Sequence, residues 1–196
     1  MPKVSAKTIL DDAMRKKYAV SAFAINNMEQ VQSIVEAAHI CRSPLIIMIS
    51  KKSLEYSKYL PYLIDAAIKE NPDIPIAMHL DHGKNFEQCR EAIDFGFSSV
   101  MIDGSFDEEE KPSSYAYNLE VTKSVADYAH KFGVTVEGEI GFIGGKEDDI
   151  DIKGHKFTDP RIVKEFVEHT GVDSLAVSIG NSHGLNKFDG EQKLRF

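Results

Sequence analysis

The chain has 196 residues, of which 42% are hydrophobic and 28% charged, a balance typical of one globular domain with one core. Its 23 Lys and Arg residues against 31 Asp and Glu residues give a net charge of −8, which argues against binding nucleic acid through the phosphates. The N-terminus has no signal-peptide core, and no apolar run reaches the roughly 20 residues that span a membrane. We therefore expect a single domain over 1–196, in the cytoplasm, with no nucleic-acid or membrane partner.

Short apolar runs alternate with amphipathic stretches along the chain. A leading helix is expected over 5–17, and strands are predicted at 18–25, 44–50, 75–80, 98–103, 134–140 and 174–180. The strands are nearly continuous in apolar character, as expected of strands that are buried on both faces. Gly96, Gly133 and Gly171 each fall just before a strand, where a helix C-terminus favours glycine. The pattern predicts parallel βαβ units.

Cys41 and Cys89 lie inside helix-like stretches and have no CxxC spacing. Such a pair is more typical of two buried thiols than of a disulfide. Free thiols fit a reducing compartment, in agreement with the expected location in the cytoplasm.

Two architectures compete for this pattern. Six strands in a chain of this length fit a doubly wound sheet, whereas a TIM barrel has eight strands and typically ~250 residues. Polar residues come at or just after the ends of five different strands: Ser50, Asp81 with His82, Asp103, Glu139 and His183. A central site supplied by many strand ends is the barrel arrangement, and no GxGxxG motif follows the first strand. The placement of these residues therefore favours an α/β barrel.

His82 and His183 both stand at a strand end and are followed by glycine. Neutral imidazole is the commonest metal ligand, and carboxylates such as Asp103 and Glu139 are its typical neighbours. We interpret the four residues as a candidate metal site. The alternative interpretation is two unrelated loop histidines.

Asp81 would point away from His82 in a regular strand, because successive side chains alternate between the two faces. Three roles are open for Asp81: a metal ligand, a general acid or base, or a carboxylate that orients a histidine. His79 lies on the same strand face as Asp81, and we interpret it as a buried structural histidine.

The segment 138–157 is a glycine- and acid-rich excursion after the fifth strand. Long loops inside compact domains are usually lids or disordered segments. The paired Gly144 and Gly145 predict a hinge that would deliver Glu147 to the site on closure. The alternative is a solvated acidic patch made by Glu147, Asp148 and Asp149.

The sequence resembles the class II fructose-bisphosphate aldolases, which are metal-dependent lyases on a TIM (β/α)8 barrel. The resemblance rests on motifs that run from the N-terminus to the last residue: AFAINNMEQVQ, IPIAMHLDHG, GFSSVMIDGS, VTVEGEIGFIGG, TGVDSLAVSIGNSHG and KFDGEQKL. It implies a barrel of which this chain supplies about six strands. It also implies the glycolytic and gluconeogenic cleavage of fructose 1,6-bisphosphate to dihydroxyacetone phosphate and glyceraldehyde 3-phosphate. The implied cofactor is Zn2+, the implied partners are sugar bisphosphates and triose phosphates, and the implied assembly is a homodimer or larger.

The resemblance also implies a role for individual residues. His82 and His183 would bind the catalytic zinc, and Asp103 and Glu139 would accept a second divalent or monovalent ion. The remaining implied roles are proton transfer to and from the C4 hydroxyl by Asp81, proton exchange on the dihydroxyacetone phosphate carbon by Glu147, and binding of the substrate's phosphate and nearby oxygens by Ser50, Gly184 and Lys187. A metal ion held by histidines stabilises the enediolate left by aldol cleavage, so no Schiff-base lysine is required.

The sequence departs from the family pattern at several positions. Ala24 and Met48 stand where the family usually has Asn and Gln, and Lys146 replaces an acid beside Glu147. The family also continues into two further strands, which carry a third zinc histidine and more substrate-binding groups. Two alternatives therefore stay open: a tagatose-bisphosphate aldolase, and a non-catalytic aldolase-like remnant that serves as a binding module.

Overall fold

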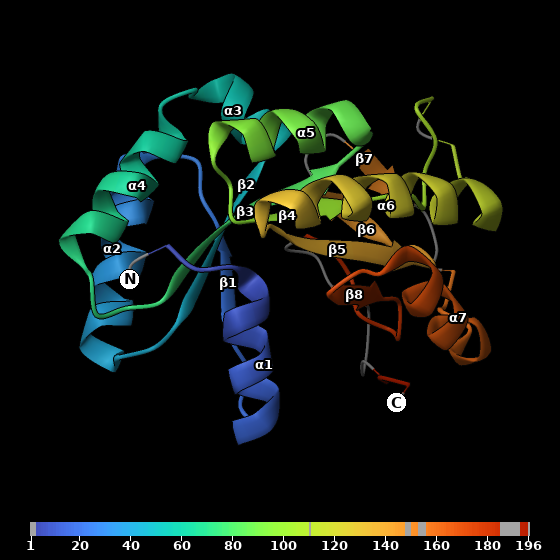
Figure 1. Cartoon of the computed structure of the whole chain (residues 1–196), viewed down its shortest axis with the longest axis horizontal. Coiled ribbons are helices and arrows are strands. Elements are labelled where there is room, and N and C mark those ends of the chain that lie inside the picture. The colour runs from blue at the N-terminus through green and yellow to red at the C-terminus, as the bar shows by residue number, and fades with distance from the viewer. Residues whose placement is uncertain (1–2, 110, 148–149, 153–155, 185–192, 196) are drawn as a thin grey trace.

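The computed structural model describes residues 3–109, 111–147, 150–152, 156–184 and 193–195. Six parallel strands form one sheet in the order β1-β2-β3-β4-β5-β8. Their bounds are β1 Ser21–Ala24, β2 Leu45–Ser50, β3 Ile76–Gly83, β4 Ser99–Ile102, β5 Thr135–Ile140 and β8 Ser174–Val177. The strands curl into a half-barrel (Figure 1). All six predicted strands are confirmed.

The strand order decides between the two predicted architectures. Each strand of the sheet pairs with the one before it in the chain, and the order never reverses. A doubly wound sheet must reverse its order at a switch point, whereas a barrel is wound in one direction. The barrel expectation is confirmed, and the doubly wound alternative is wrong.

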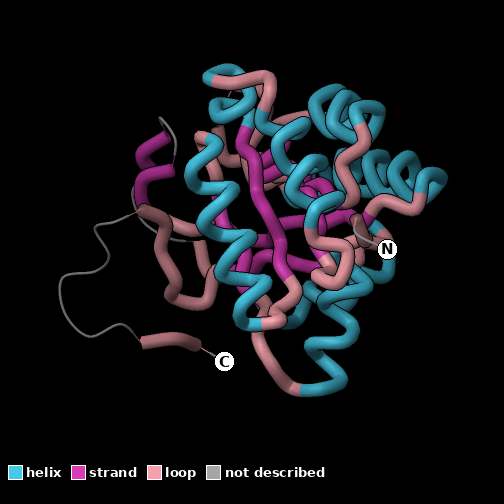
Figure 2. The backbone as a smooth tube through the Cα atoms, turned by 90° about the vertical axis from the view of Figure 1, so that its left-hand side faces the viewer, coloured by secondary structure: helices cyan, strands magenta, loops and turns pink. Residues whose placement is uncertain are grey.

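Seven α-helices accompany the sheet within the described part of the chain. Their bounds are α1 Ala6–Lys16, α2 Met28–Cys41, α3 Lys51–Tyr56, α4 Leu60–Glu70, α5 Phe86–Phe95, α6 Tyr115–Ala129 and α7 Pro160–Thr170, with a short 3-10 turn at His130–Phe132. Helices α2 to α7 surround the outside of the curled sheet, whereas α1 lies against one end of it (Figures 1 and 2). None of the described helices is long and apolar enough to cross a membrane.

Local sequence explains where these helices begin and end. The side chains of Asn27 and Asn85 accept hydrogen bonds from the backbone of the first turns of α2 and α5, which satisfies otherwise unpaired N–H groups. Gly96, Gly133 and Gly171 all have the left-handed conformation that ends a helix or its 3-10 extension. The predicted glycine positions are therefore confirmed.

The strands separate two apolar regions. Alternate residues of β2, such as Leu45, Ile47 and Ile49, belong to the large core between the sheet and the outer helices. The residues between them face the inside, where Ile46 packs with Ala6 and other residues of α1. Because α1 lies against the starts of the strands, it covers the N-terminal end of the half-barrel (Figure 1).

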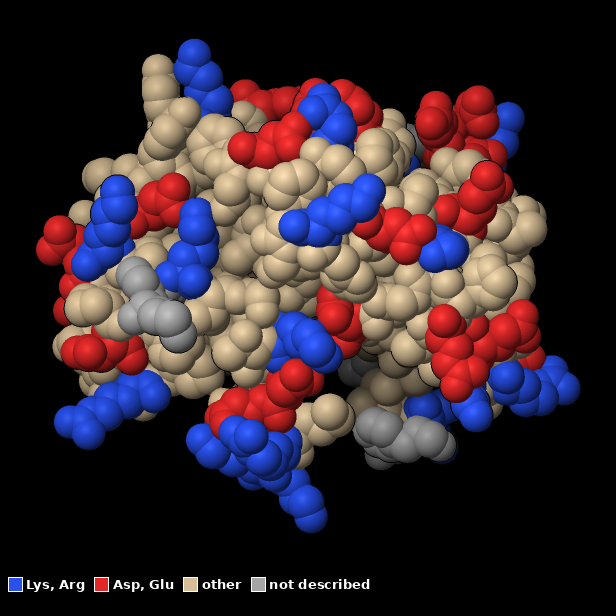
Figure 3. All heavy atoms as spheres, viewed as in Figure 1, with Lys and Arg blue, Asp and Glu red and all other residues tan. Residues whose placement is uncertain are grey.

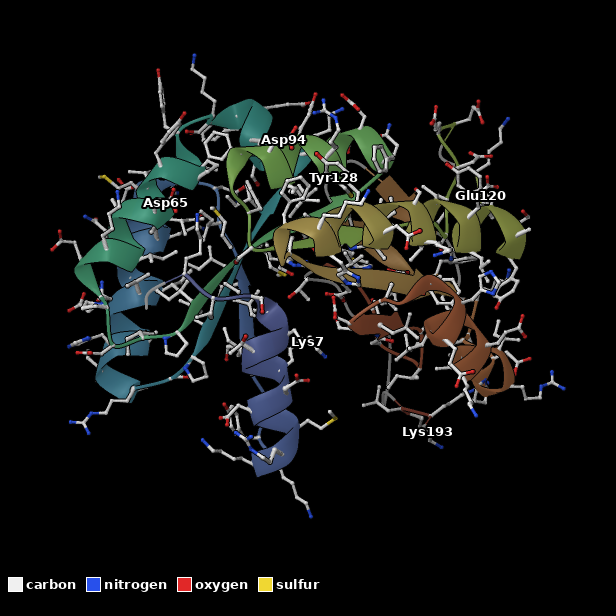
Figure 4. The ribbon with its side chains drawn as sticks, in the orientation of Figure 1. Lys7, Asp65, Asp94, Glu120, Tyr128 and Lys193 are labelled. Carbon is white, nitrogen blue, oxygen red and sulfur yellow. The ribbon has the colours of Figure 1, made fainter. Side chains whose placement is uncertain are left out.

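Contacts between neighbouring elements secure this arrangement. The Lys7 backbone N–H of α1 donates to Thr135 Oγ1 at the start of β5, over 3.0 Å. On the outside, the side chains of Tyr128 in α6 and Asp94 in α5 meet (Figure 4), and the tyrosine hydroxyl donates to Asp94 Oδ1 over 2.9 Å. Acidic and basic side chains are interspersed over the face drawn in Figure 3, in keeping with an acidic but mixed surface.

Two expectations need correction. Both cysteines are free thiols, but only Cys89 is buried; Cys41 is exposed, because it is the last residue of α2 and lies beyond the helix's buried residues. The excursion after β5 is also not simply a loop. It contains a short antiparallel hairpin of β6 Gly145–Glu147 and β7 Ile150–Ile152.

Candidate metal centre

Three side chains from three neighbouring strands converge at one end of the half-barrel. His82 lies near the end of β3, Asp103 directly follows β4, and Glu139 lies near the end of β5. One ligand atom of each residue lies within 4.8 Å of the others. The carboxyl ends of parallel strands meet at one edge, which explains how residues so distant in sequence come together.

Asp103 fixes the ring of His82. The imidazole Nδ1 donates to Asp103 Oδ2 over 3.1 Å, and Asp103 Oδ1 accepts from the backbone N–H and the hydroxyl of Ser105, at 3.0 Å and 2.6 Å. Burial on its own would raise the pKa of Asp103. The hydrogen bond and charge of His82, together with the two hydrogen bonds from Ser105, have a larger effect, and the pKa is lowered overall. The ionised Asp103 accepts a hydrogen bond from Nδ1–H of His82, and this tautomer leaves a lone pair on Nε2.

His183 lies against His82, although the two residues are 101 positions apart in the sequence. Their ring centroids are 5.4 Å apart, with the planes at 74°. The backbone of His183 is held by the hairpin: its N–H donates to the carbonyl of Gly144 over 3.0 Å, and it bridges to Gly145. The structure therefore brings the two predicted histidines together.

An irregularity in β3 aims His82. The register with β4 shifts between Leu80 and Gly83, and His82 has a φ of 47°. This left-handed conformation is uncommon outside glycine, and such bulges often redirect a side chain beside a functional site. Regular alternation, which would point His82 away from Asp81, does not hold here. The bulge turns His82 toward Glu139, which lies on the inner face of β5.

A second polar group lies deeper inside the half-barrel. His79 is 4% exposed, shares a 2.7 Å hydrogen bond with Ser99 Oγ through Nδ1, and places Nε2 3.8 Å from Glu137 Oε2. Burial, with a smaller effect from His82, lowers the pKa of His79 to about 4, so the ring is neutral at pH 7. Burial and the charge of Asp81 raise the pKa of Glu137 to about 7.

Glu137 and Ser99 were missed at the sequence level. Glu137 stands two residues before Glu139, and this spacing places both side chains on the same strand face. That spacing was the available signal for Glu137. Nothing comparable marked Ser99, which is a serine inside an apolar strand.

Of the other predicted site residues, those that the structure describes lie around the same end of the half-barrel. Ser50 ends β2 beside Asp81 in the β2–β3 register, and its hydroxyl accepts the N–H of Ser53 over 3.2 Å to cap α3. Asp81 is half-buried. Gly184 follows His183 with a φ of 78°. Glu147 is the last residue of β6, and Lys187, Asp148 and Asp149 lie outside the described residues.

The donor set at this end fits a divalent transition metal. Two imidazoles lie in contact, and two carboxylates lie within reach of one of them. Imidazole nitrogen with carboxylate oxygen suits Zn2+ and its neighbours better than Mg2+ or Ca2+, which prefer oxygen alone. A singly wound parallel half-barrel with such a centre at its strand ends defines a TIM-barrel protein with a candidate metal site.

Comparisons with known proteins narrow this class. The family model for class II fructose-bisphosphate aldolase matches residues 4–196. A fructose-bisphosphate aldolase of Giardia intestinalis is 47% identical over the whole chain, which spans 59% of that protein. One of Staphylococcus aureus is 43% identical over the whole chain, which spans 67% of it. The chain belongs to the class II fructose-bisphosphate aldolase family.

Solved structures agree with this assignment. The YdjI aldolase of Escherichia coli K12 superposes with a TM-score of 0.79 at 31% identity, covering 98% of this chain and 66% of its own. The fructose-bisphosphate aldolase of Campylobacter jejuni superposes with a TM-score of 0.70 over 95% of this chain and 61% of its own. At 24% identity, the second likeness supports the fold alone.

Proposed function

We propose that this chain carries the catalytic metal centre of a fructose-bisphosphate aldolase, which reversibly cleaves fructose 1,6-bisphosphate into dihydroxyacetone phosphate and glyceraldehyde 3-phosphate. The observation that carries the proposal is the convergence of His82, Asp103 and Glu139, with the ring of His183 against His82. The relatives that bear this name extend beyond the part matched here, so the proposal concerns the site that this chain contributes.

The proposed cofactor is Zn2+, with His82 and His183 as two of its ligands. When bound, the ion acts as a Lewis acid that stabilises the negative charge of the enediolate. Asp103 holds the His82 ring through Nδ1 and keeps Nε2 as the ligating nitrogen. Asp103 and Glu139 together are the proposed place for a second or displaced cation. Glu139 is 2% exposed, and a carboxylate buried so deeply is stabilised by a bound cation.

Asp81 is the proposed general acid and base for the C4 hydroxyl. It lies at the end of β3 next to His82, and the register puts Ser50 beside it. A carboxylate there can take the hydroxyl proton during cleavage and return it during condensation, if substrate lies within hydrogen-bond reach. Glu147 is proposed to exchange the proton on the dihydroxyacetone phosphate carbon. Ser50, Gly184 and Lys187 are proposed to bind substrate oxygens.

Several wider properties are part of the same proposal. The substrates are sugar bisphosphates and triose phosphates, the pathway is glycolysis and gluconeogenesis, and the location is the cytoplasm. The assembly is a homodimer or larger, and residues 1–196 all belong to one barrel domain, of which they supply about six strands. These follow from membership of the family rather than from a contact in the structure.

A cleavage assay tests the proposal. The protein in its full natural length, loaded with one equivalent of Zn2+, is given fructose 1,6-bisphosphate and tagatose 1,6-bisphosphate in parallel, with and without a chelator. We expect cleavage of the fructose substrate that the chelator abolishes and that Asp81→Asn lowers about 100-fold or more. The matched control is Asp73→Asn, which changes an exposed aspartate and should leave the rate unchanged.

The assay also separates the alternatives. Faster cleavage of the tagatose substrate would assign the chain to that stereochemistry. Zinc binding without cleavage of either substrate would support the binding module. Cleavage that survives both the chelator and Asp81→Asn would contradict the proposed mechanism.

A further inference from the structure

The conformation of His82 requires support from its surroundings. Its φ of 47° lies in the left-handed region, which is unfavourable for a residue other than glycine. Strained conformations of this kind persist only where the neighbouring structure enforces them. The question is therefore which contacts hold the bulge of β3 in place.

The residue after His82 is packed too closely for any side chain. A Cβ built on Gly83 would lie 2.7 Å from Cys89 Sγ, 2.7 Å from the Met101 carbonyl oxygen and 3.2 Å from Leu80 Cδ2. Real Cβ atoms do not approach other atoms to 2.7 Å, and one of these neighbours is backbone, which cannot rotate away. Only glycine lets β3 come this close to α5 and β4 at this point.

Hydrogen bonds from β4 and α5 hold the backbone after His82, and one further bond joins these two elements to each other. From β4, the Asp103 N–H donates to the Gly83 carbonyl over 2.9 Å. From α5, the Cys89 thiol donates to the Met101 carbonyl over 3.7 Å, and Gln88 Oε1 accepts the Lys84 N–H over 3.1 Å. Cys89 is 1% exposed, and burial raises its pKa to about 12, so the thiol keeps its proton and acts as a packing group.

We propose that Gly83, packed against the Cys89 thiol and the Met101 carbonyl, is a positioning residue that holds the bulge of β3 and so turns the His82 imidazole toward Asp103 and Glu139. The same carbonyl of Gly83 that completes the bulge anchors the backbone of Asp103, so one contact places two members of the candidate metal centre. The part that concerns metal rests on the proposed function, whereas the placement of the His82 ring does not.

Two variants test the packing from opposite sides. Gly83→Ala inserts the forbidden Cβ, and Cys89→Ala removes the sulfur that fills the space beside Gly83. Cys89→Ser keeps a hydrogen-bond donor of similar shape and should behave more like the wild type than Cys89→Ala does. The matched control is Cys41→Ala, because Cys41 is exposed at the end of α2.

The first measurement needs no metal. Long-range 1H–15N spectra of the metal-free chain report the tautomer and surroundings of each imidazole, with the His82 signals assigned by their loss in His82→Ala. We expect Gly83→Ala and Cys89→Ala to shift the His82 ring signals and Cys41→Ala to leave them in place. Far-UV circular dichroism establishes that each variant is folded. Unchanged His82 signals in folded Gly83→Ala and Cys89→Ala would overturn the proposal.

The second measurement is the affinity of the same variants for Co2+. Binding is monitored through the visible absorbance of the bound ion. Outer contacts that orient a ligand are typically worth 10- to 100-fold in metal affinity. We expect a loss of about 10-fold in Cys89→Ala, more in Gly83→Ala, and none in Cys41→Ala. A loss of thermal stability with wild-type Co2+ affinity would show a purely structural role and contradict the proposal. If the variants shift the His82 signals but the wild-type chain binds no Co2+, the proposed function is rejected and the positioning role stands.

Discussion

The two faces of the same strands have different chemistry. On β5, Val136 and Ile140 face the outer helices and belong to the large apolar core. On its inner face, Thr135 meets α1, Glu137 approaches His79, and Glu139 reaches the candidate metal centre. Burying ionisable groups costs stability unless they are bonded, paired or bound to a metal. We infer that the outer face holds the fold together, whereas the inner face carries chemistry that the outer core must support.

The largest expected effect breaks the outer core. Phe166 of α7 is 0% exposed and packs near Gly138 and Tyr115. Phe166→Ala should lower the free energy of unfolding by about 3–5 kcal/mol, because it removes buried apolar contacts and leaves a cavity. The control is Phe132→Ala, at a side chain that is 58% exposed. Urea unfolding measures the free energy of unfolding of both variants. If both lost the same small amount, the outer core would not stabilise the fold as described.

A smaller effect is expected from the inner face at acidic pH. The pKa of His79 is about 4 when folded, against 6.5 for an ordinary imidazole. Between these values the unfolded chain binds a proton that the folded chain does not, so stability is lost as pH falls from 6.5 toward 4. The loss attributable to His79 is roughly 3 kcal/mol.

The measurement compares the wild type with His79→Asn by urea unfolding at pH 7, 5.5 and 4.5. The stability difference between the two proteins should shrink as pH falls, because only the wild type loses this contribution. His39→Asn changes an exposed histidine and should keep a constant difference from the wild type. A constant difference for His79→Asn as well would contradict the buried, neutral ring.

The smallest effect concerns Glu137 and has the opposite sign. Its pKa is about 7 when folded, against an ordinary value of 4.5. The folded chain therefore keeps a proton that the unfolded chain releases, and this contribution is lost as pH rises from 4.5 through 7. The same conversion as for His79 would give roughly 3 kcal/mol, but the Glu137 side chain is 29% exposed, so water screens part of the effect. In chelator-treated protein, Glu137→Gln should therefore gain roughly 1–2 kcal/mol relative to the wild type between pH 4.5 and 8. Glu36→Gln, at an exposed glutamate, should gain none.

These differences also explain what the sequence could and could not predict. The strands were predictable from their runs of apolar residues, and β2 and β3 do pack apolar side chains on both faces. The expected burial is wrong for β1, whose four residues are all exposed. The meeting of His82 and His183 was predictable in part: His82 lies near the end of β3, but β8 already ends at Val177, and His183 is held beside the hairpin instead. The bulge was not predictable, because no residue type signals a positive φ at a histidine.

Other parts of the site depended on tertiary contacts. Glu137 was overlooked because its pKa and its neighbours His79 and Asp81 become apparent only when β3 and β5 lie on either side of β4. The hairpin of β6 and β7 was expected as a loop, since each strand has only three residues and little apolar pattern. Cys41 was expected to be buried, because the periodicity of α2 does not show where the helix passes the edge of the core.

The most direct test of the account is a Co2+ titration of the wild-type chain against His82→Ala, followed by visible absorbance. We expect the wild type to bind one equivalent and His82→Ala to lose at least about 100-fold in affinity, because it removes a ligand rather than an outer contact. His39→Ala removes an exposed imidazole and should bind as the wild type does. Equal binding by wild type and His82→Ala, or none by either, would contradict a metal centre on the inner face of the half-barrel.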